Sequence, residues 1–304
     1  MNIYPLKLKP YMKSVIWGGK ALKKKFKKEL DSDIVGETWE LSARENCESI
    51  IVNGEYEGMT FREYLTQSGI NPDTFPLLIK FIDASKPLSV QVHPDKTEMW
   101  YIIDAARGSK LLYGFSEDTT KEEFALSLRS GTPRDIEACI NHVAVHPGEV
   151  YFIPSGLIHA LGEGILIAEI QQNNDTTYRL YDYDRKDENG NPRELHVEKG
   201  LEAIRPMRES KIYAQRFLRG RITERTLVNC EQFCVERHTV RTSLTQDNHY
   251  GTHVLCIDGS GMIGDVSFKA GEGIYVPKGM ESFTVKAERP LTVLITKSYP
   301  PVNE

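Results

Sequence analysis

Short apolar runs, separated by Gly, Pro, Asn or Asp, recur along most of the chain. Runs of this length, rich in branched residues and bounded by turn formers, predict β-strands. Where apolar and polar residues alternate, one face of the strand is buried and the other is polar. Such a series of short strands is typical of β-sandwiches and barrels. The predicted strands cover residues 49–52, 77–82, 88–92, 99–103, 143–145, 150–153 and 165–170.

Helical patterns are fewer and lie between the strands. They predict helices at residues 60–68, 120–130 and 197–204. The second begins with DTTKEEF, in which a capping side chain precedes glutamates that favour the positive end of the helix dipole. The basic run KKKFKKE, residues 23–29, is interpreted as a solvated loop or helix face. We therefore expect a mainly β protein with a few peripheral helices.

Composition and charge exclude several classes of protein. The 304 residues include 38 basic and 43 acidic side chains, and the net charge of -5 gives no global attraction to nucleic acid or to an anionic membrane. No apolar stretch approaches the roughly 18 residues of a membrane span, and the start lacks the apolar segment of a secretion signal. Five cysteines without a CxxC pair are expected to be reduced. We expect a cytoplasmic protein with room for two modest domains.

Side chains with the chemistry of metal ligands gather around one predicted turn, within residues 77–103. In SVQVHP the valines share one face of a strand, so Gln91 and His93 point to the other face, and Glu98 opens the next apolar run. Together they offer an amide oxygen, an imidazole and a carboxylate, which suits zinc or another divalent ion. His159, after a PSG turn, is the best candidate for the missing ligand. The plain alternative is that Gln91 and His93 face solvent on an edge strand.

Several segments, in one order along the chain, resemble the type I mannose-6-phosphate isomerases, in particular their short bacterial form. They are YMKSVIWGG, GETWELSA, LLIKFIDASKPLSVQVHPDKTEMWYI, PSGLIHALGEGILIAEIQ and NDTTYRLYDYDR. Members of this family are zinc-dependent cupin enzymes that interconvert mannose 6-phosphate and fructose 6-phosphate. The resemblance implies one Zn²⁺ per chain, bound by Gln91, His93, Glu98 and His159. It also implies an active-site arginine and two further catalytic candidates, namely Arg179, Lys96 and Asp175.

An internal repeat supports two β domains of the cupin type. The segment GEVYFIPSGLIHA, from Gly148, recurs in outline as GEGIYVPKGMESFT, from Gly271. When the two copies are aligned, His159 matches Ser282, and the run before the second copy contains no Gln-x-His. We expect two cupin-type jelly-roll barrels: a catalytic metal-binding domain at residues 1–207 and a degenerate domain at residues 208–304.

Three side chains are candidates for substrate binding. Lys80 is out of place on an apolar strand unless its ammonium reaches a polar cavity, although it could also extend to water. Glu169 alternates with apolar residues and could face the same cavity or form a buried structural ion pair. Trp17 and Trp39 are expected in the core or the cavity wall, with substrate contact by Trp17 as a further possibility.

The tyrosine-rich stretch NDTTYRLYDYDR leaves two roles open. A surface position is the plain alternative for Arg179, whereas the resemblance favours a cation that stabilises an oxyanion or steadies the sugar phosphate. Asp175 could orient Arg179, relay a proton, or lie in an Asx-turn. Lys96, on the turn between two ligands, would supply positive charge near the metal.

The resulting hypothesis is an aldose-ketose isomerase that forms a cis-enediolate, stabilised by zinc and Arg179. The base is open among Lys96, Asp175, Glu169 and a metal-bound water. Two other classes share the barrel: an Fe(II) cupin oxygenase, which usually has more imidazole ligands, and a non-catalytic sugar-binding cupin. The expected partner is a small sugar phosphate, with neither nucleic acid nor membrane, and the chain would be a monomer or weak homo-oligomer.

Overall fold

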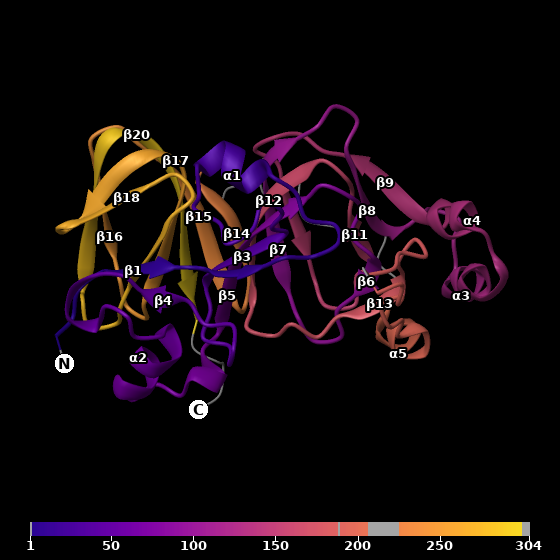
Figure 1. Cartoon of the computed structure of the whole chain (residues 1–304), viewed down its shortest axis with the longest axis horizontal. Helices are drawn as coiled ribbons and strands as arrows, with labels where there is room; N and C mark the ends of the chain where they lie inside the picture. Colours follow the sequence, from indigo (N-terminus) through magenta and orange to yellow (C-terminus); the bar gives the residue numbers. More distant parts are fainter. Residues whose placement is uncertain (1, 188, 206–224, 300–304) are drawn as a thin grey trace.

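The computed structural model of the chain describes residues 2–187, 189–205 and 225–299. Antiparallel strands make up most of it, and the few helices lie toward the edges (Figure 1). A mainly β protein with few helices is therefore confirmed. The domain boundary expected between residues 207 and 208 lies outside the described residues. No helix within the described ranges is long and apolar enough to span a bilayer.

The described strands form three antiparallel sheets. The first contains, in spatial order, β14 (Thr226–Asn229), β15 (Phe233–Val240), β20 (Ser282–Ser298), β17 (Thr252–Ile263), β19 (Gly273–Val276), β1 (Leu6–Lys9) and β4 (Ile50–Ile51), with β16 (Ser243–Asp247) beside β20 and β18 (Val266–Lys269) beside β17. The second contains β10 (Val150–Ile153), β7 (Glu98–Ala105), β12 (Ile165–Gln172), β5 (Leu77–Ala84), β3 (Glu37–Leu41) and β2 (Tyr11–Lys13). The third contains β13 (Tyr178–Tyr181), β6 (Val90–Val92), β11 (His159–Leu161), β8 (Lys110–Phe115) and β9 (Ile140–Ala144).

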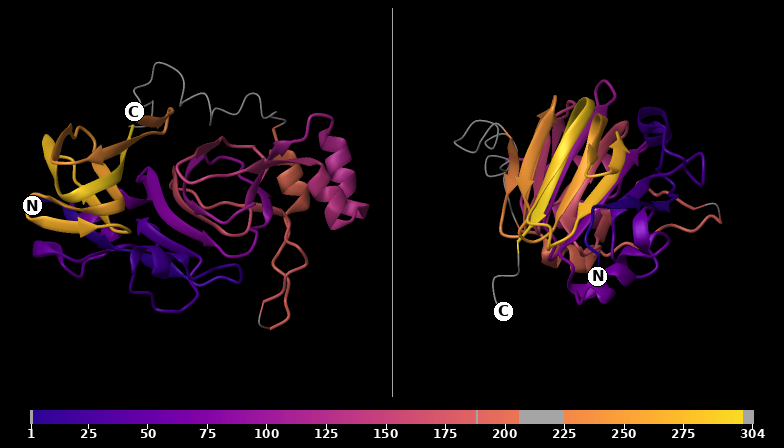
Figure 2. Two further views of the ribbon diagram at one scale, coloured as in Figure 1. Left: turned by 90° about the horizontal axis from the view of Figure 1, so that it is seen from above. Right: turned by 90° about the vertical axis from the view of Figure 1, so that its left-hand side faces the viewer.

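Both ends of the described chain contribute to the first sheet. β1 pairs with β19 and with β4, so Leu8 lies opposite both Gly273 and Ile51. Figure 2 shows these indigo N-terminal strands beside the yellow C-terminal strands. The N-terminal residues therefore extend the C-terminal sheet, an arrangement that the apolar pattern did not predict.

The helices are short, and threonine caps define several of their starts. Thr60, Thr120 and Thr132 each accept a hydrogen bond from the N–H three residues on, and the acidic side chain there reaches back to the cap. This reciprocal cap satisfies backbone donors that would otherwise lack partners. The helices are α1 (Ala21–Phe26), α2 (Phe61–Gln67), α3 (Lys121–Ser130), α4 (Pro133–Ala138) and α5 (Val197–Ala203), with 3-10 turns at Gly54–Tyr56 and Pro72–Thr74.

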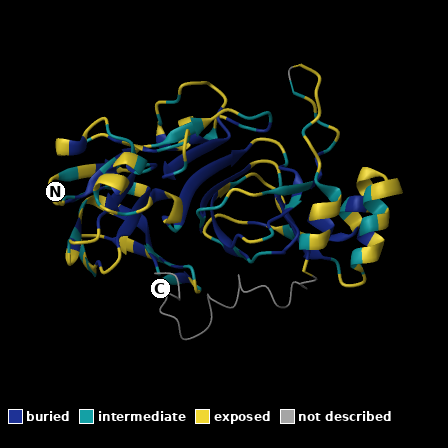
Figure 3. Ribbon diagram, turned by 90° about the horizontal axis from the view of Figure 1, so that it is seen from below, coloured by how far each residue is buried: buried dark blue, intermediate teal, exposed yellow. Residues whose placement is uncertain are grey.

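The second sheet packs between the other two, and strand alternation decides which side chains face each neighbour. On β5, Ile79 and Phe81 belong to a core cluster shared with the first sheet, whereas Ile82 packs with residues of the third sheet. Lys80, between Ile79 and Phe81, therefore faces the third sheet as well. Figure 3 shows the buried central strands in dark blue and the partly exposed outer helices in yellow.

Each predicted strand and helix overlaps an observed element of the same type. The missed strands include β1, β2, β3, β8, β11 and β13, and α4 was also missed. β3 was missed because its sequence, ETWEL, contains two glutamates and a threonine and so is not an apolar run, yet all five residues are buried. Its polar side chains can be buried because they have partners, as shown below.

Candidate active site

Three neighbouring strands of the third sheet align polar side chains in one row. β6 lies between β11 and β13, so Gln91 is opposite His159 on one side and Arg179 on the other. Opposite residues on paired strands point to the same face of a sheet. His93 directly follows β6, and Glu98 is the first residue of β7. Residues that are distant in the sequence therefore meet in one place.

The buried ligand atoms of His93, Glu98 and His159 lie within 4.8 Å of one another. Nε2 of His93 is 3.5 Å from Glu98 Oε2, and Nε2 of His159 is 3.6 Å from Glu98 Oε1. Donors that share a tetrahedral zinc ion lie about 3.4 Å apart, so these separations suit a common cation. His93 Nε2 and Glu98 Oε1 are buried without a hydrogen-bond partner among the described residues. Because unpaired buried lone pairs cost free energy, these atoms fit a metal between them.

Backbone carbonyls hold both histidine rings in the form that binds metal. Nδ1 of His93 donates to Thr176 O, and Nδ1 of His159 donates to Leu157 O, each at 2.9 Å. Nε2 is then the unprotonated nitrogen of each ring. Burial and the nearby Lys96 lower the pKa of His93 to about 4, and burial lowers the pKa of His159. Both rings are therefore neutral near pH 7.

Gln91 and Lys96 border this group. The amide Nε2 of Gln91 is 3.3 Å from His159 Nε2, and a half-turn of the amide would direct its oxygen there instead. Lys96 Nζ is 2.9 Å from Glu98 Oε2. Burial alone would raise the pKa of Glu98, but Lys96 and the two histidines hold that pKa well below its usual range. The carboxylate is therefore ionised and can bind a cation.

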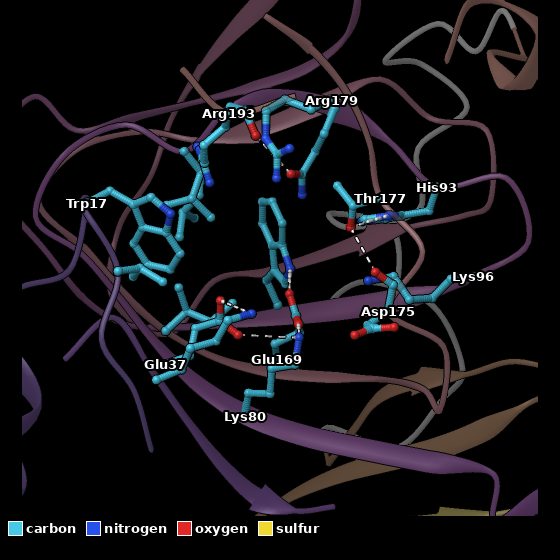
Figure 4. Close-up of a pocket in the computed structure, with 18 of the residues that line it drawn as sticks. Trp17, Glu37, Lys80, His93, Lys96, Glu169, Asp175, Thr177, Arg179 and Arg193 are labelled. Carbon is cyan, nitrogen blue, oxygen red and sulfur yellow. Dashed lines mark hydrogen bonds and ion pairs between the residues drawn. The ribbon is translucent and has the colours of Figure 1, made fainter. Parts of the chain in front are cut away.

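A cavity of about 450 Å³ lies beside this group, with walls from the second and third sheets (Figure 4). Its volume suits a small-molecule ligand. Trp17 is buried in its wall. Glu98 and His159 are buried behind the wall and do not line the cavity. The other eight candidates line it: Trp17, Lys80, Gln91, His93, Lys96, Glu169, Asp175 and Arg179.

A row of side chains crosses the second sheet and faces the cavity. Trp39, Lys80, Glu169 and Trp100 lie opposite one another on β3, β5, β12 and β7. Lys80 Nζ is 3.1 Å from Glu169 and 3.7 Å from Glu37. Trp100 donates to Glu169 at 2.9 Å, and Trp39 donates to Glu37 at 2.8 Å. Burial alone would lower the pKa of Lys80, but Glu169 and Glu37 raise it above its ordinary value. Glu169 thus both faces the cavity and forms a buried ion pair.

Asp175 and Arg179 line the same cavity but have different partners. Asp175 Oδ1 pairs with Arg44 Nη2 at 2.8 Å, so within the described residues its ion pair is with Arg44 rather than Arg179. The Asx-turn of this stretch belongs to Asn174, whose side chain accepts a hydrogen bond from Thr176 N at 2.8 Å. The contacts of Asp175 therefore do not support its orienting Arg179.

Comparison with known proteins identifies the family. A family model described as the catalytic domain of type I phosphomannose isomerase matches residues 5–129. The chain is 37% identical to the mannose-6-phosphate isomerase ManA of Bacillus subtilis over 314 residues, covering 94% of this chain and 97% of that protein. This chain belongs to the type I phosphomannose isomerase family. A mannose-6-phosphate isomerase of Streptococcus mutans is 39% identical over 217 residues, which cover 66% of this chain and 67% of that protein.

Solved structures of phosphomannose isomerases share the fold. The crystal structure of the Bacillus subtilis enzyme matches with a TM-score of 0.81 and 33% identity, covering 96% of this chain and 99% of that one. A zinc-bound mannose 6-phosphate isomerase matches with a TM-score of 0.74 and 14% identity, covering 97% of this chain and 100% of that one. The second likeness concerns the fold alone.

The phosphomannose isomerase cavity of this chain has lining residues that sequence reasoning missed. Trp39 lines the cavity, in agreement with its expected place in the core or the cavity wall. Glu37 lies in the same GETWELSA segment, so its place in a matched motif was the available signal. Arg193 and His196 also line the cavity, but they come from a segment after β13 that no motif singled out. The lining residues that the sequence did not predict include Lys13, Glu37, Trp100, Arg193 and His196.

Proposed function

We propose that this chain is a zinc-dependent isomerase that interconverts D-mannose 6-phosphate and D-fructose 6-phosphate through a cis-enediolate. The observation that carries the proposal is the convergence of His93, Glu98 and His159 beside a polar cavity. Family membership supplies the substrate, since the relatives carry the name mannose-6-phosphate isomerase.

Zinc would be held by Gln91, His93, Glu98 and His159. One carboxylate among neutral donors leaves a bound Zn²⁺ with net positive charge, so it would act as a Lewis acid toward substrate oxygens. The buried His93 and Glu98 lone pairs and the two carbonyl-bonded rings support this donor set. The zinc-bound neighbour of the same fold is consistent with zinc as the metal.

The residues of the chain itself would orient the sugar and move protons. Isomerisation transfers a proton between C1 and C2, which needs a base and a stabiliser for the developing oxyanion. We assign oxyanion stabilisation to Arg179, whose strand lies beside that of Gln91. Lys96, Glu169 and Asp175 are the candidates for the proton shuttle. Of these three, Lys96 contacts a proposed metal ligand directly.

Lys80 and Glu37 would bind sugar hydroxyls, with Trp17 excluding water from one wall. Lys80 and the carboxylates beside it form a compact set of donors and acceptors on the cavity surface. Such paired groups bind neutral hydroxyls because they offer both kinds of hydrogen-bonding partner at fixed positions.

The repeat between the segments from Gly148 and Gly271 also supports a division into two domains. We propose two cupin-type barrels, a catalytic one at residues 1–207 and a degenerate one at residues 208–304, with β1 and β4 extending the second. A cytoplasmic location and a monomeric or weakly associated state belong to this proposal.

Purified chain incubated with mannose 6-phosphate should produce fructose 6-phosphate, and a chelator should abolish turnover until zinc is restored. The metal-replete chain without any such product would contradict the proposal. Oxygen uptake with bound iron would favour a cupin oxygenase. Tight substrate binding without turnover would favour a sugar-binding cupin.

A further inference from the structure

Two guanidinium groups line one end of the cavity. Arg179 and Arg193 are drawn beside each other in Figure 4, away from Glu37 and Lys80. Arg179 Nη1 donates to Glu194 O at 2.9 Å, and His196 N donates to Arg179 O at 2.7 Å. The segment carrying Arg193 is thereby attached to β13. We call the surface formed by Arg179 and Arg193 the arginine end.

Asp182 anchors Arg193 from the protein side. Its carboxylate is buried and accepts from Arg193 Nε at 2.7 Å and from Nη2 at 2.5 Å, and it also accepts from Arg185. Burial alone would raise the pKa of Asp182, but hydrogen bonds from Arg193 and Arg185 lower it. This paired contact fixes one edge of the Arg193 guanidinium and, within the described part of the chain, leaves Nη1 for another acceptor.

The charges at the arginine end do not cancel. Asp182 is shared by Arg185 and Arg193, Arg179 adds a third positive charge nearby, and Glu194 adds a second carboxylate, so three cations face two anions. Burial and the neighbouring Arg193 lower the pKa of Arg179, which shows that these cations act on one another. An anion placed between them would therefore be strongly favoured.

The opposite end of the cavity has a different balance. Lys80 lies between Glu37 and Glu169, and Lys13 is 3.8 Å from Glu37, so two ammonium groups face two carboxylates. A phosphate monoester carries about -1.5 to -2 charge near pH 7 and would gain nothing from a balanced surface. The two ends thus differ in the kind of substrate group that each suits.

We propose that Arg193 is the phosphate-binding residue of this cavity and that Asp182 is the positioning residue that aims it. The phosphate would lie on Arg193, whereas Arg179, opposite the proposed ligand Gln91, would face the C1 and C2 oxygens, and the remaining hydroxyls would point toward Lys80. This inference rests on the proposed function, because the phosphate is that of the substrate.

The test combines steady-state kinetics with inorganic phosphate as a competitive inhibitor, using the zinc-loaded chain. Arg193→Ala should raise KM for mannose 6-phosphate and the inhibition constant of phosphate about 30-fold, with kcat changed less than about threefold. Arg193→Lys should give an intermediate shift, because it keeps the charge but loses the planar fork. Asp182→Asn should raise KM in the same direction with kcat retained.

Arg129→Ala is the matched control, because Arg129 is an exposed arginine paired with Glu198 on the outer helices. It should leave both constants unchanged. If Arg193→Ala does not fold, as judged by circular dichroism and melting, Arg193→Lys and Asp182→Asn decide the question.

If the wild-type chain is active and the Arg193 variants keep the same KM and the same inhibition by phosphate, this inference is wrong and the proposed function stands. Inactive wild-type chain would overturn the proposed function instead. Calorimetric titration of wild type and Arg193→Ala with inorganic phosphate would then still decide whether Arg193 binds phosphate.

Discussion

Two turns, one from Gly148 and one from Gly271, have the same hydrogen bonds in different parts of the molecule. In both, the glycine N–H donates at 2.8 Å to a residue of an earlier strand, Ile102 of β7 or Cys256 of β17, and that residue donates back to the carbonyl of the next glutamate. In both, the glutamate carboxylate accepts from the N–H three residues earlier. The repeat expected from the sequence is therefore present in the backbone.

The side chains that follow these turns differ. After the first turn, His159 is buried opposite Gln91, whereas after the second, Ser282 is exposed opposite Asp247. In the second region the buried Asn248 side chain instead donates to the carbonyls of Pro277 and Met280, which follow β19, at 2.8 and 3.0 Å. The same backbone turn therefore occurs with and without a candidate metal site. What differs is whether a group of buried, unpaired ligand atoms converges beside it.

The largest expected effect separates the two turns directly. His159→Ala should lose stoichiometric zinc and lower kcat/KM about 1000-fold, because a Lewis acid contributes several kcal/mol to catalysis. Ser282→Ala, at the matching position, should change neither quantity. Metal analysis and isomerase assays of both variants test this, and zinc retained at one per chain in His159→Ala would show that His159 is not a ligand.

Arg179 offers the second test, because β16, the counterpart of β6, pairs within the described residues only with β20 and so lacks an equivalent of β13. Arg179→Ala should lower kcat about 100-fold while zinc content is retained, since one oxyanion-stabilising donor is worth that much. Kinetics and metal analysis on the same preparation check it. An unchanged kcat would remove Arg179 from the reaction.

Asn248 should affect stability rather than activity. Asn248→Ala should lower the free energy of unfolding by about 2 kcal/mol, because it leaves the carbonyls of Pro277 and Met280 without this donor. Denaturant unfolding measures the loss, and kcat of the folded variant should match wild type. A fall in kcat with unchanged stability would contradict the structural role of this turn.

The last test concerns how the free energy of unfolding depends on pH. His253 is fully buried, neither ring nitrogen has a partner among the described residues, and burial lowers its pKa from 6.5 to about 3. Above pH 6.5 the imidazole is neutral in both the folded and the unfolded chain, and the stability of the fold is fully present. As the pH falls from 6.5 toward 3, only the unfolded chain binds the proton, so this stability is progressively lost. At pH 5 the loss relative to neutral pH is about 2 kcal/mol.

His253→Leu should therefore unfold with a weaker pH dependence than wild type between pH 7 and pH 5. Unfolding free energies at several pH values give the comparison. Parallel curves for the two chains would mean that His253 is not buried in its neutral form.

Much of the fold was predictable because apolar runs bounded by turn residues specify strands. The grouping of three proposed ligands was predictable for a local reason: Gln91 and His93 alternate with buried valines, and Glu98 opens the next strand. β3 was not predictable in this way, since Glu37 and Glu40 are buried only by pairing with Lys80 and Lys28, which lie elsewhere in the chain.

The arginine end shows the same limit. Arg193 reaches the cavity because Asp182 holds it and because residues near it bond to β13. Those contacts depend on how a loop folds back, which neither periodicity nor local motifs report. The pairing of Asp175 with Arg44 is likewise a contact between distant segments.

Anomalous diffraction at the zinc edge, on crystals of the zinc-loaded chain, is the most direct test of whether these four side chains bind zinc. The account predicts one zinc peak per chain, with donor atoms of Gln91, His93, Glu98 and His159 at about 2.0–2.2 Å from it. A zinc peak elsewhere, or zinc-loaded crystals in which these four side chains hold no metal, would contradict the account.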